Sequence, residues 1–160
     1  PSVFGDQALL LPRYYTPKRM EKRYKLGVIP HVIDWDYDVM RKIRKERNDI
    51  LVIDLAHYDK WTDVIDQICS CEAIASSSLH GLIVSDAYHV PNCWITLSGK
   101  ISGGLFKYFD YFSSVGREEA GPVKVERMSD LQKIENKMVS WKPIAIDTDP
   151  ILNSCPFYRA

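Results

Sequence analysis

The segment SSSLHGLIVSDAY, residues 76–88, holds the side chains best suited to chemistry. It follows the short apolar run of residues 73–75 and leads into Leu82, Ile83 and Ala87, whose spacing is helical. The pattern predicts a buried strand that turns into a helix. Backbone N–H groups at a helix start are unpaired, and the helix dipole adds partial positive charge there. The segment therefore predicts a binding site for a phosphate or a carboxylate.

His80 is the residue of this segment that can exchange a proton near neutral pH. We expect it either to donate a proton or to hold an anionic ligand as imidazolium. Backbone N–H groups and hydroxyls around it would bind the anion's oxygen atoms. The residues expected to bind in this way are Ser76, Ser77, Ser78, Leu79 and Gly81. The structural alternative is that His80 caps the helix and the serines satisfy backbone groups at its start.

Gly81 has two interpretations of equal weight. Its backbone can come close to a ligand, or the helix can come close to a neighbouring strand, because glycine lacks a Cβ atom. Asp86, further along the helix, is expected to be structural.

The elements around this segment alternate along the chain. Strands are predicted at residues 24–31, 50–56, 73–76 and 92–97, and helices at residues 35–47, 59–71, 81–88, 105–114 and 128–139. A short helix ending near Pro12, a loop over residues 13–23 and a glycine-rich loop over residues 98–104 complete the prediction. Strands alternating with helices indicate βαβ units. The fold class is therefore α/β, a Rossmann-like parallel sheet flanked by helices.

Ligands of such sheets bind at the carboxyl ends of the strands. His31 and Asp34 follow the first predicted strand, and His31 is the second candidate for catalysis. Asp54 and His57 follow the second strand, where a turn residue and a helix-orienting carboxylate are the favoured interpretation. Residues 98–100 follow the fourth strand.

An anionic ligand also needs cations, and four are candidates: Arg13, Lys25, Lys100 and Lys107. Arg13 lies in the segment before the first strand, Lys100 follows a glycine in a loop, and Lys107 belongs to the aromatic helix. In that helix, Phe106, Phe109 and Phe112 are expected in the core. Tyr108 and Tyr111 are expected on another face, where they could stack on a sugar ring.

Composition narrows the class of protein. The chain has 160 residues, 46% hydrophobic and 26% charged, which is ordinary for one globular domain. Lys plus Arg equals Asp plus Glu at 21 each, so no overall field draws the chain to nucleic acid, and none is expected as a partner. No apolar run reaches the ~20 residues of a membrane helix. With no visible signal peptide, we expect a cytoplasmic location, with a peripheral place at the inner membrane face allowed.

The four cysteines do not form the paired C-x-x-C sets of a zinc site. We therefore expect free thiols in a reducing compartment and no metal. No Walker or dinucleotide glycine motif is present either, so no cofactor is expected.

Several segments together resemble the polysaccharide pyruvyl transferase family. The segments are GDQALLLPRYY, LGVIPH, VIDL, SCEAIASSSLHGLIVSDAYHVP and FKYFDYFSSVG, between about residues 5 and 116. The resemblance implies a two-domain fold like that of B-type glycosyltransferases. It also implies pyruvate transfer from phosphoenolpyruvate onto two hydroxyls of one sugar, forming a cyclic ketal. The acceptor would be a saccharide of a cell-surface polysaccharide or of its lipid-linked precursor.

The resemblance covers the second, C-terminal domain of that family, the half expected to bind the donor. Residues 1–23 would be an interdomain helix and linker, residues 24–116 the sheet and helix core, and residues 117–160 a C-terminal helix and tail. The N-terminal domain is expected to be absent, and Pro1 in place of Met indicates a fragment or a processed product.

One departure from the family concerns the residue before Leu-His, which is Arg in some members and Ser78 here. A serine binds an anion by hydrogen bonding but brings no charge. Either a cation from elsewhere replaces the arginine, or the donor is held differently. Two alternatives remain: the nucleotide-sugar half of a B-type glycosyltransferase, in which Glu72 or Glu118 would contact the sugar, and a non-catalytic fragment that binds a glycan or a partner.

Overall fold

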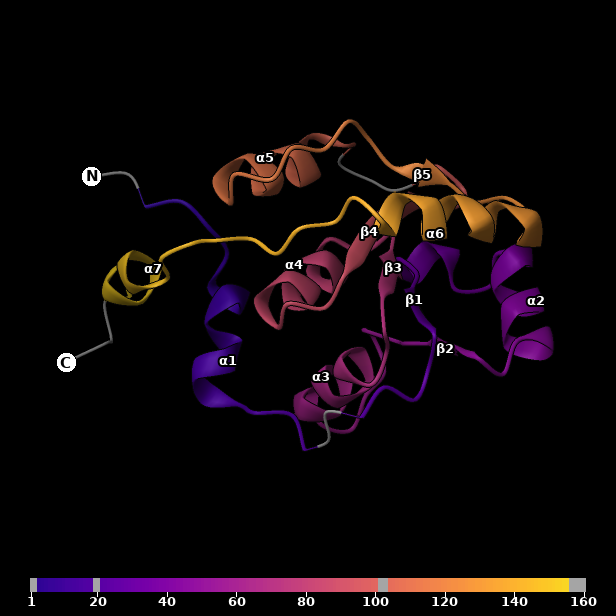
Figure 1. The fold of residues 1–160 in the computed structure, drawn as a ribbon, viewed down its shortest axis with the longest axis horizontal. Helices are drawn as coiled ribbons and strands as arrows, with labels where there is room; N and C mark the ends of the chain where they lie inside the picture. The colour runs from indigo at the N-terminus through magenta and orange to yellow at the C-terminus, as the bar shows by residue number, and fades with distance from the viewer. Residues whose placement is uncertain (1–2, 19–20, 101–103, 156–160) are drawn as a thin grey trace.

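Five parallel strands form the centre of the protein, in the spatial order β2-β1-β3-β4-β5 (Figure 1). The structure, a computed structural model, describes residues 3–18, 21–100 and 104–155. The strands are β1 (Leu26–Ile29), β2 (Ile50–Val52), β3 (Ile74–Ser76), β4 (Asn92–Thr96) and β5 (Val123–Lys124). This confirms the prediction of an α/β fold with a Rossmann-like parallel sheet. Residues 19–20 and 101–103 of the two predicted loops lie outside the described residues.

The strand order creates a switch point between β1 and β3. β1 pairs in parallel with β2 on one side and with β3 on the other. The chain therefore leaves the carboxyl ends of these two neighbours in opposite directions, which opens a crevice where ligands of such sheets bind. His31 follows β1 and the serine-rich segment follows β3, so both reach this point.

Helices cover both faces of the sheet. The 3₁₀ turns are η1 (Gln7–Leu10), η2 (Val32–Asp34) and η3 (Met128–Asp130), and the α-helices are α1 (Leu11–Tyr14), α2 (Asp38–Glu46), α3 (Trp61–Cys69), α4 (Leu79–Ala87), α5 (Phe106–Ser114), α6 (Leu131–Met138) and α7 (Asp149–Asn153). α2 and α6 pack their apolar side chains on one face, and α3 and α4 on the other (Figure 1). Among the described residues, none of these helices is long and apolar enough to cross a membrane.

The segment before β1 is built into the domain. Leu9 and Leu10 of η1 are buried in one core cluster with α4 and α5. The predicted end of this helix near Pro12 is wrong, because Pro12 lies in the first turn of α1. A proline is tolerated there, since the first turn has no backbone partner for its missing N–H.

Two further predictions for the C-terminal part need correction. The chain adds the short strand β5 and the helix α7, which the single predicted C-terminal helix did not include. A two-residue strand is too short to show a pattern. The predicted capping box at Ser129 and Gln132 is also wrong, because the Asp130 carboxylate accepts the backbone N–H groups of Glu126 and Arg127, each at 3.0 Å.

The structure contradicts the prediction for four of the five aromatic side chains of α5. Tyr108 and Tyr111 are buried, so they do not present a surface for a sugar. Phe106 and Phe109, expected in the core, are 77% and 40% exposed. The Tyr108 ring stacks on Trp94 with 4.6 Å between centroids. Its hydroxyl donates to the Ser77 carbonyl at 2.7 Å, which satisfies the buried polar end of the ring. Phe112 is in the core, as predicted.

The absence of a side chain at Gly81 allows α4 to lie directly on the sheet. A Cβ atom there would come 3.1 Å from two methyl carbons of Ile29 in β1, and closer still to the Ser76 hydroxyl in β3. Gly81 is fully surrounded, and Leu82 and Ile83 after it are buried. The packing interpretation of this glycine therefore holds.

Replacing Gly81 with alanine is expected to destabilise the fold. Overpacking costs typically ~1–3 kcal/mol, which the better helix propensity of alanine only partly offsets. We expect a net loss of about 1 kcal/mol or more, measured as a lower urea midpoint at unchanged slope. His80→Ala, one residue earlier on the same helix and exposed, is the matched control and should unfold like the parent. A Gly81→Ala midpoint equal to that of His80→Ala would contradict the packing role.

Candidate functional site

The carboxyl ends of β1 and β3 are joined by serine hydroxyls and backbone groups. The Ser76 hydroxyl donates to the Ile29 carbonyl at 3.2 Å, and the Ser77 N–H donates to the same oxygen at 3.0 Å. The His31 N–H donates to the Ser77 hydroxyl at 2.8 Å. Ser76 and Ser77 are fully buried. Their hydroxyls therefore position the backbone of the site, as the structural alternative for these serines states.

A cleft of about 400 Å³ opens where these strand ends meet the end of β2. Its lining residues are Pro30, His31, Val32, Trp35, Asp36, Asp54, Leu55, Ala56, His57 and Ser78. The cleft thus brings together four residues that the sequence placed at the strand ends: His31, Ser78, Asp54 and His57. A cleft of this size with a few polar groups in apolar walls is typical of small-molecule sites.

α4 starts directly after Ser78, which lines this cleft. Ser78 is the residue before the helix, in an extended conformation, and within the described residues no side chain caps the helix at that position. The first N–H groups of the helix, from Leu79 to Gly81, are therefore left for an anion or water. His80 lies on this first turn with an exposed side chain and does not line the cleft itself.

Two hydrogen bonds position His31, one from its backbone N–H to Ser77 and one from the Ile33 N–H to its ring. Its Nδ1 atom accepts the Ile33 N–H at 3.4 Å, so the neutral ring carries its proton on Nε2. The side chain is half-buried and lines the cleft. His31 is thus placed to donate a hydrogen bond to a ligand.

Asp54 and His57 form a pair at the end of β2. The Asp54 carboxylate accepts the N–H groups of Ala56 at 2.7 Å and of His57 at 3.2 Å, which is the turn that the sequence indicated. Its other oxygen lies 3.0 Å from His57 Nδ1. Burial acts to raise the pKa of Asp54, but these hydrogen bonds outweigh it and the pKa is lowered. The carboxylate is therefore ionised at neutral pH and orients the imidazole.

The candidate cations Arg13, Lys25 and Lys107 do not line this cleft and lie in different parts of the fold. Arg13 pairs with Asp149 of α7 at 2.5 Å, and Lys25 with Glu135 of α6 at 2.9 Å. Lys107 lines a second cavity together with Leu79, the first residue of α4.

Lys100 follows β4, where a buried carboxylate is also found. Its backbone N–H donates to the Ser98 hydroxyl at 3.2 Å, and that hydroxyl in turn donates to the carboxylate of Asp34. Asp34 is fully buried, and its second oxygen has no hydrogen-bond partner among the described residues. This chain of contacts ties the segment after β4 to the segment after β1.

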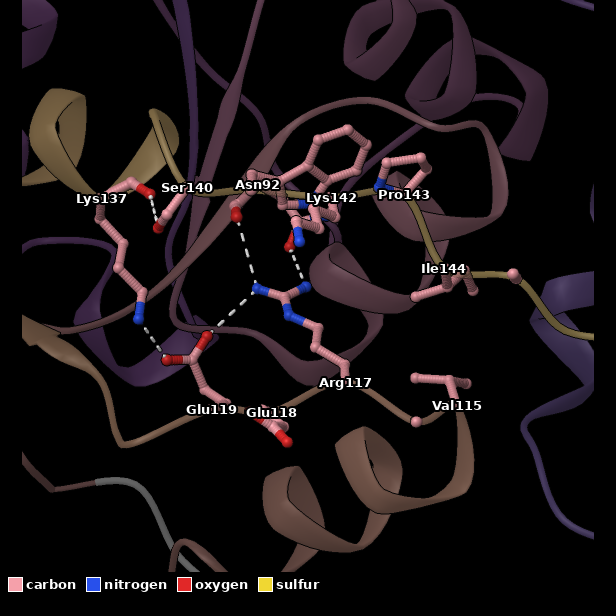
Figure 2. Close-up of a pocket in the computed structure, with 13 residues that line it drawn as sticks. Asn92, Val115, Arg117, Glu118, Glu119, Lys137, Ser140, Lys142, Pro143 and Ile144 are labelled. Atoms are coloured by element: carbon pink, nitrogen blue, oxygen red, sulfur yellow. Dashed lines mark hydrogen bonds and ion pairs between the residues drawn. The ribbon is translucent and has the colours of Figure 1, made fainter.

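Another cavity, about 590 Å³, lies at the opposite edge of the sheet, at the amino end of β4. Figure 2 shows Arg117 at its centre, bonded to Asn92 at 2.6 Å and to Glu119 at 3.3 Å, with Lys137 on Glu119 at 2.7 Å. Arg117 also pairs with the fully buried Asp86 at 3.1 Å. The charges therefore neutralise one another within the fold. Arg117 was not predicted as a partner of Asp86, although a carboxylate inside the apolar helix α4 is a signal for a buried cation.

Fold and site together define a class, an α/β domain of Rossmann type with a candidate anion site at the switch point of its sheet. The family model described as polysaccharide pyruvyl transferase matches residues 7–99. The chain belongs to this family. The match spans the sheet from β1 to β4 and includes His31 and the start of α4, whereas Lys107 and Arg117 lie beyond it.

A curated relative is similar along nearly the whole chain. Uncharacterized protein L143 of Acanthamoeba polyphaga mimivirus is 28% identical over 153 residues, which cover 94% of this chain and 53% of that protein. The chain thus spans about half the length of this relative. No solved structure matches the chain.

Removing Arg117 is expected to destabilise the protein strongly. Arg117→Ala leaves Asp86 as an uncompensated buried charge, which typically costs ~3–5 kcal/mol. Lys124→Ala is the control, because it breaks an exposed pair with Glu126 and such pairs contribute ~1 kcal/mol or less. Urea unfolding followed by circular dichroism compares the two. Equal stability of the two variants would show that the Arg117 network does not support the fold.

Proposed function

We propose that the chain is the donor-binding half of a ketal-pyruvyl transferase, an enzyme that moves pyruvate from phosphoenolpyruvate onto two hydroxyls of one sugar. The observation that carries the proposal is the cleft at the β1–β3 switch point, with His31 and Ser78 in its lining, beside an uncapped helix start. Membership of the polysaccharide pyruvyl transferase family supports the choice of reaction.

The start of α4 suits a ligand with two anionic groups. Phosphoenolpyruvate carries a phosphate and a carboxylate, and the N–H groups of residues 79–81 would bind one of them with the help of the helix dipole. The Ser78 hydroxyl and the Nε2–H of His31 would donate to the other. Lys107, which shares a cavity with Leu79, would supply positive charge that Ser78 lacks.

The reaction needs one proton at carbon and a path for two hydroxyl protons. His80 as imidazolium would protonate the methylene carbon while a sugar hydroxyl bonds to the central carbon. The proton lost by that hydroxyl replaces the one that His80 gave. The second hydroxyl then bonds to the same carbon as the C–O bond to phosphate breaks, and its proton leaves with the phosphate. The products are the cyclic ketal and inorganic phosphate.

The two histidines would have different roles, one in proton transfer and one in binding the anion. His31 is tied by its N–H to Ser77 and by Nδ1 to Ile33, so it holds a fixed donor toward the cleft. His80 has an exposed ring on the first turn of α4, where a bound ligand can reach it. His80 is therefore the proposed acid, and His31 the proposed donor of a hydrogen bond to the anion.

Calorimetric titration of the chain with phosphoenolpyruvate tests the proposal. We expect binding to weaken at least about 10-fold in His80→Gln, because glutamine lacks the imidazolium charge and a charge-assisted contact with the anion contributes ~1.5–3 kcal/mol. His89→Asn is the control, because His89 is also exposed and its positive φ of 54° suits asparagine. UDP, titrated in parallel, probes the nucleotide-sugar alternative.

Equal affinity of His80→Gln and His89→Asn for phosphoenolpyruvate would remove His80 from the site. Binding of UDP without binding of phosphoenolpyruvate would favour the glycosyltransferase half-domain and overturn the proposed donor.

A further inference from the structure

The part of the cleft formed after β1 and β2 differs in character from the part at the start of α4. It consists of Val32, Trp35 and Asp36 from one connection and of Asp54 and His57 from the other. Two carboxylates and an indole lie here, with no Lys or Arg among the described lining residues. The start of α4, by contrast, offers N–H groups and the helix dipole.

The two carboxylates repel an anion and attract hydroxyl groups. The pKa of Asp54 is lowered, so this side chain is an acceptor at neutral pH. Asp36 is 81% exposed and lies 3.6 Å from the Arg44 guanidinium, so most of its oxygen surface is accessible. A phosphate or carboxylate would meet repulsion from Asp54, whereas Arg44 partly compensates the charge of Asp36. A neutral molecule with several hydroxyls could instead donate to each of them.

Trp35 gives this part of the cleft a flat apolar surface. The Arg44 guanidinium lies 4.6 Å from the centroid of the indole, which holds the ring in place. Val32, 60% exposed, adds apolar surface to the same lining. A pyranose ring has hydroxyls around its edge and C–H groups on its faces, so it matches an indole flanked by acceptors.

We infer that Trp35, Asp36, Asp54 and His57 form a binding subsite for a neutral sugar ring. The ring packs on Trp35, and its hydroxyls donate to the two carboxylates. Asp54 orients His57 through the 3.0 Å contact, which places the imidazole at the same ring. That this sugar is the pyruvyl acceptor rests on the proposed function, and the shared cleft would place it beside the donor at Ser78 and His31.

The indole N–H signals of ¹⁵N-tryptophan-labelled chain test the subsite. The probes are the methyl glycosides of galactose, glucose and mannose, with glucuronate as an anionic counterpart of glucose. We expect at least one neutral glycoside to shift the Trp35 signal in a saturable way. Trp61 is the internal control, since it is 47% exposed, lies outside the cleft and should not shift. The Trp35 signal is assigned with Trp35→Phe.

The carboxylates are tested with Asp36→Asn and Asp54→Asn. We expect each to weaken glycoside binding, by about 10-fold for Asp54→Asn, and glucuronate to bind more weakly than the methyl glucoside. No saturable shift of Trp35 with any glycoside at ~100 mM, where even complexes far weaker than 1 mM are populated, would overturn the subsite. So would equal affinity for glucuronate and the glucoside. The glycoside titrations contain no phosphoenolpyruvate, so a failure of the proposed donor leaves their result readable.

Discussion

The candidate site depends on one junction, where β3 ends against β1. The Ile29 carbonyl accepts both the Ser76 hydroxyl and the Ser77 N–H, and the Ser77 hydroxyl accepts the His31 N–H. These bonds fix the two chain segments that leave the switch point in opposite directions. The missing side chain of Gly81 then lets α4 start directly on this junction. The same contacts that close the core therefore place the uncapped start of α4 directly after Ser78, a residue of the cleft lining.

The two edges of the sheet differ in how their charged groups are paired. At the carboxyl edge, His31 and Ser78 line one cleft together with the carboxylates of Asp36 and Asp54, and α4 starts directly after Ser78. At the amino edge, Arg117 forms ion pairs with Asp86 and Glu119. The larger of the two cavities is thus a neutralised structural network, and the smaller one keeps groups that a ligand can use.

Much of this arrangement could be predicted from the sequence. Apolar runs and helical spacing gave the strands, the main helices and the strand ends where His31, Asp54 and Ser78 meet. The buried face of α5 could not be predicted, because the rings of Tyr108 and Phe109 have similar hydrophobicity. The stacking of Trp94 and the carbonyl of Ser77 decide between them. Ion pairs between residues far apart in the chain, such as Arg13 with Asp149 and Arg117 with Asp86, could not be predicted either. They depend on the tertiary fold and leave no periodic pattern in the sequence.

The anionic donor is proposed to bind at the β1–β3 junction, and amide chemical shifts test this placement most directly. Phosphoenolpyruvate is titrated into the ¹⁵N-labelled chain, and the shifts are mapped onto the sheet. Binding at the junction should give the largest shifts at residues 29–33 and 77–81, on both sides of the switch point. Shifts confined to the cavity around Arg117 and Asn92, or no shifts at residues 77–81, would contradict it.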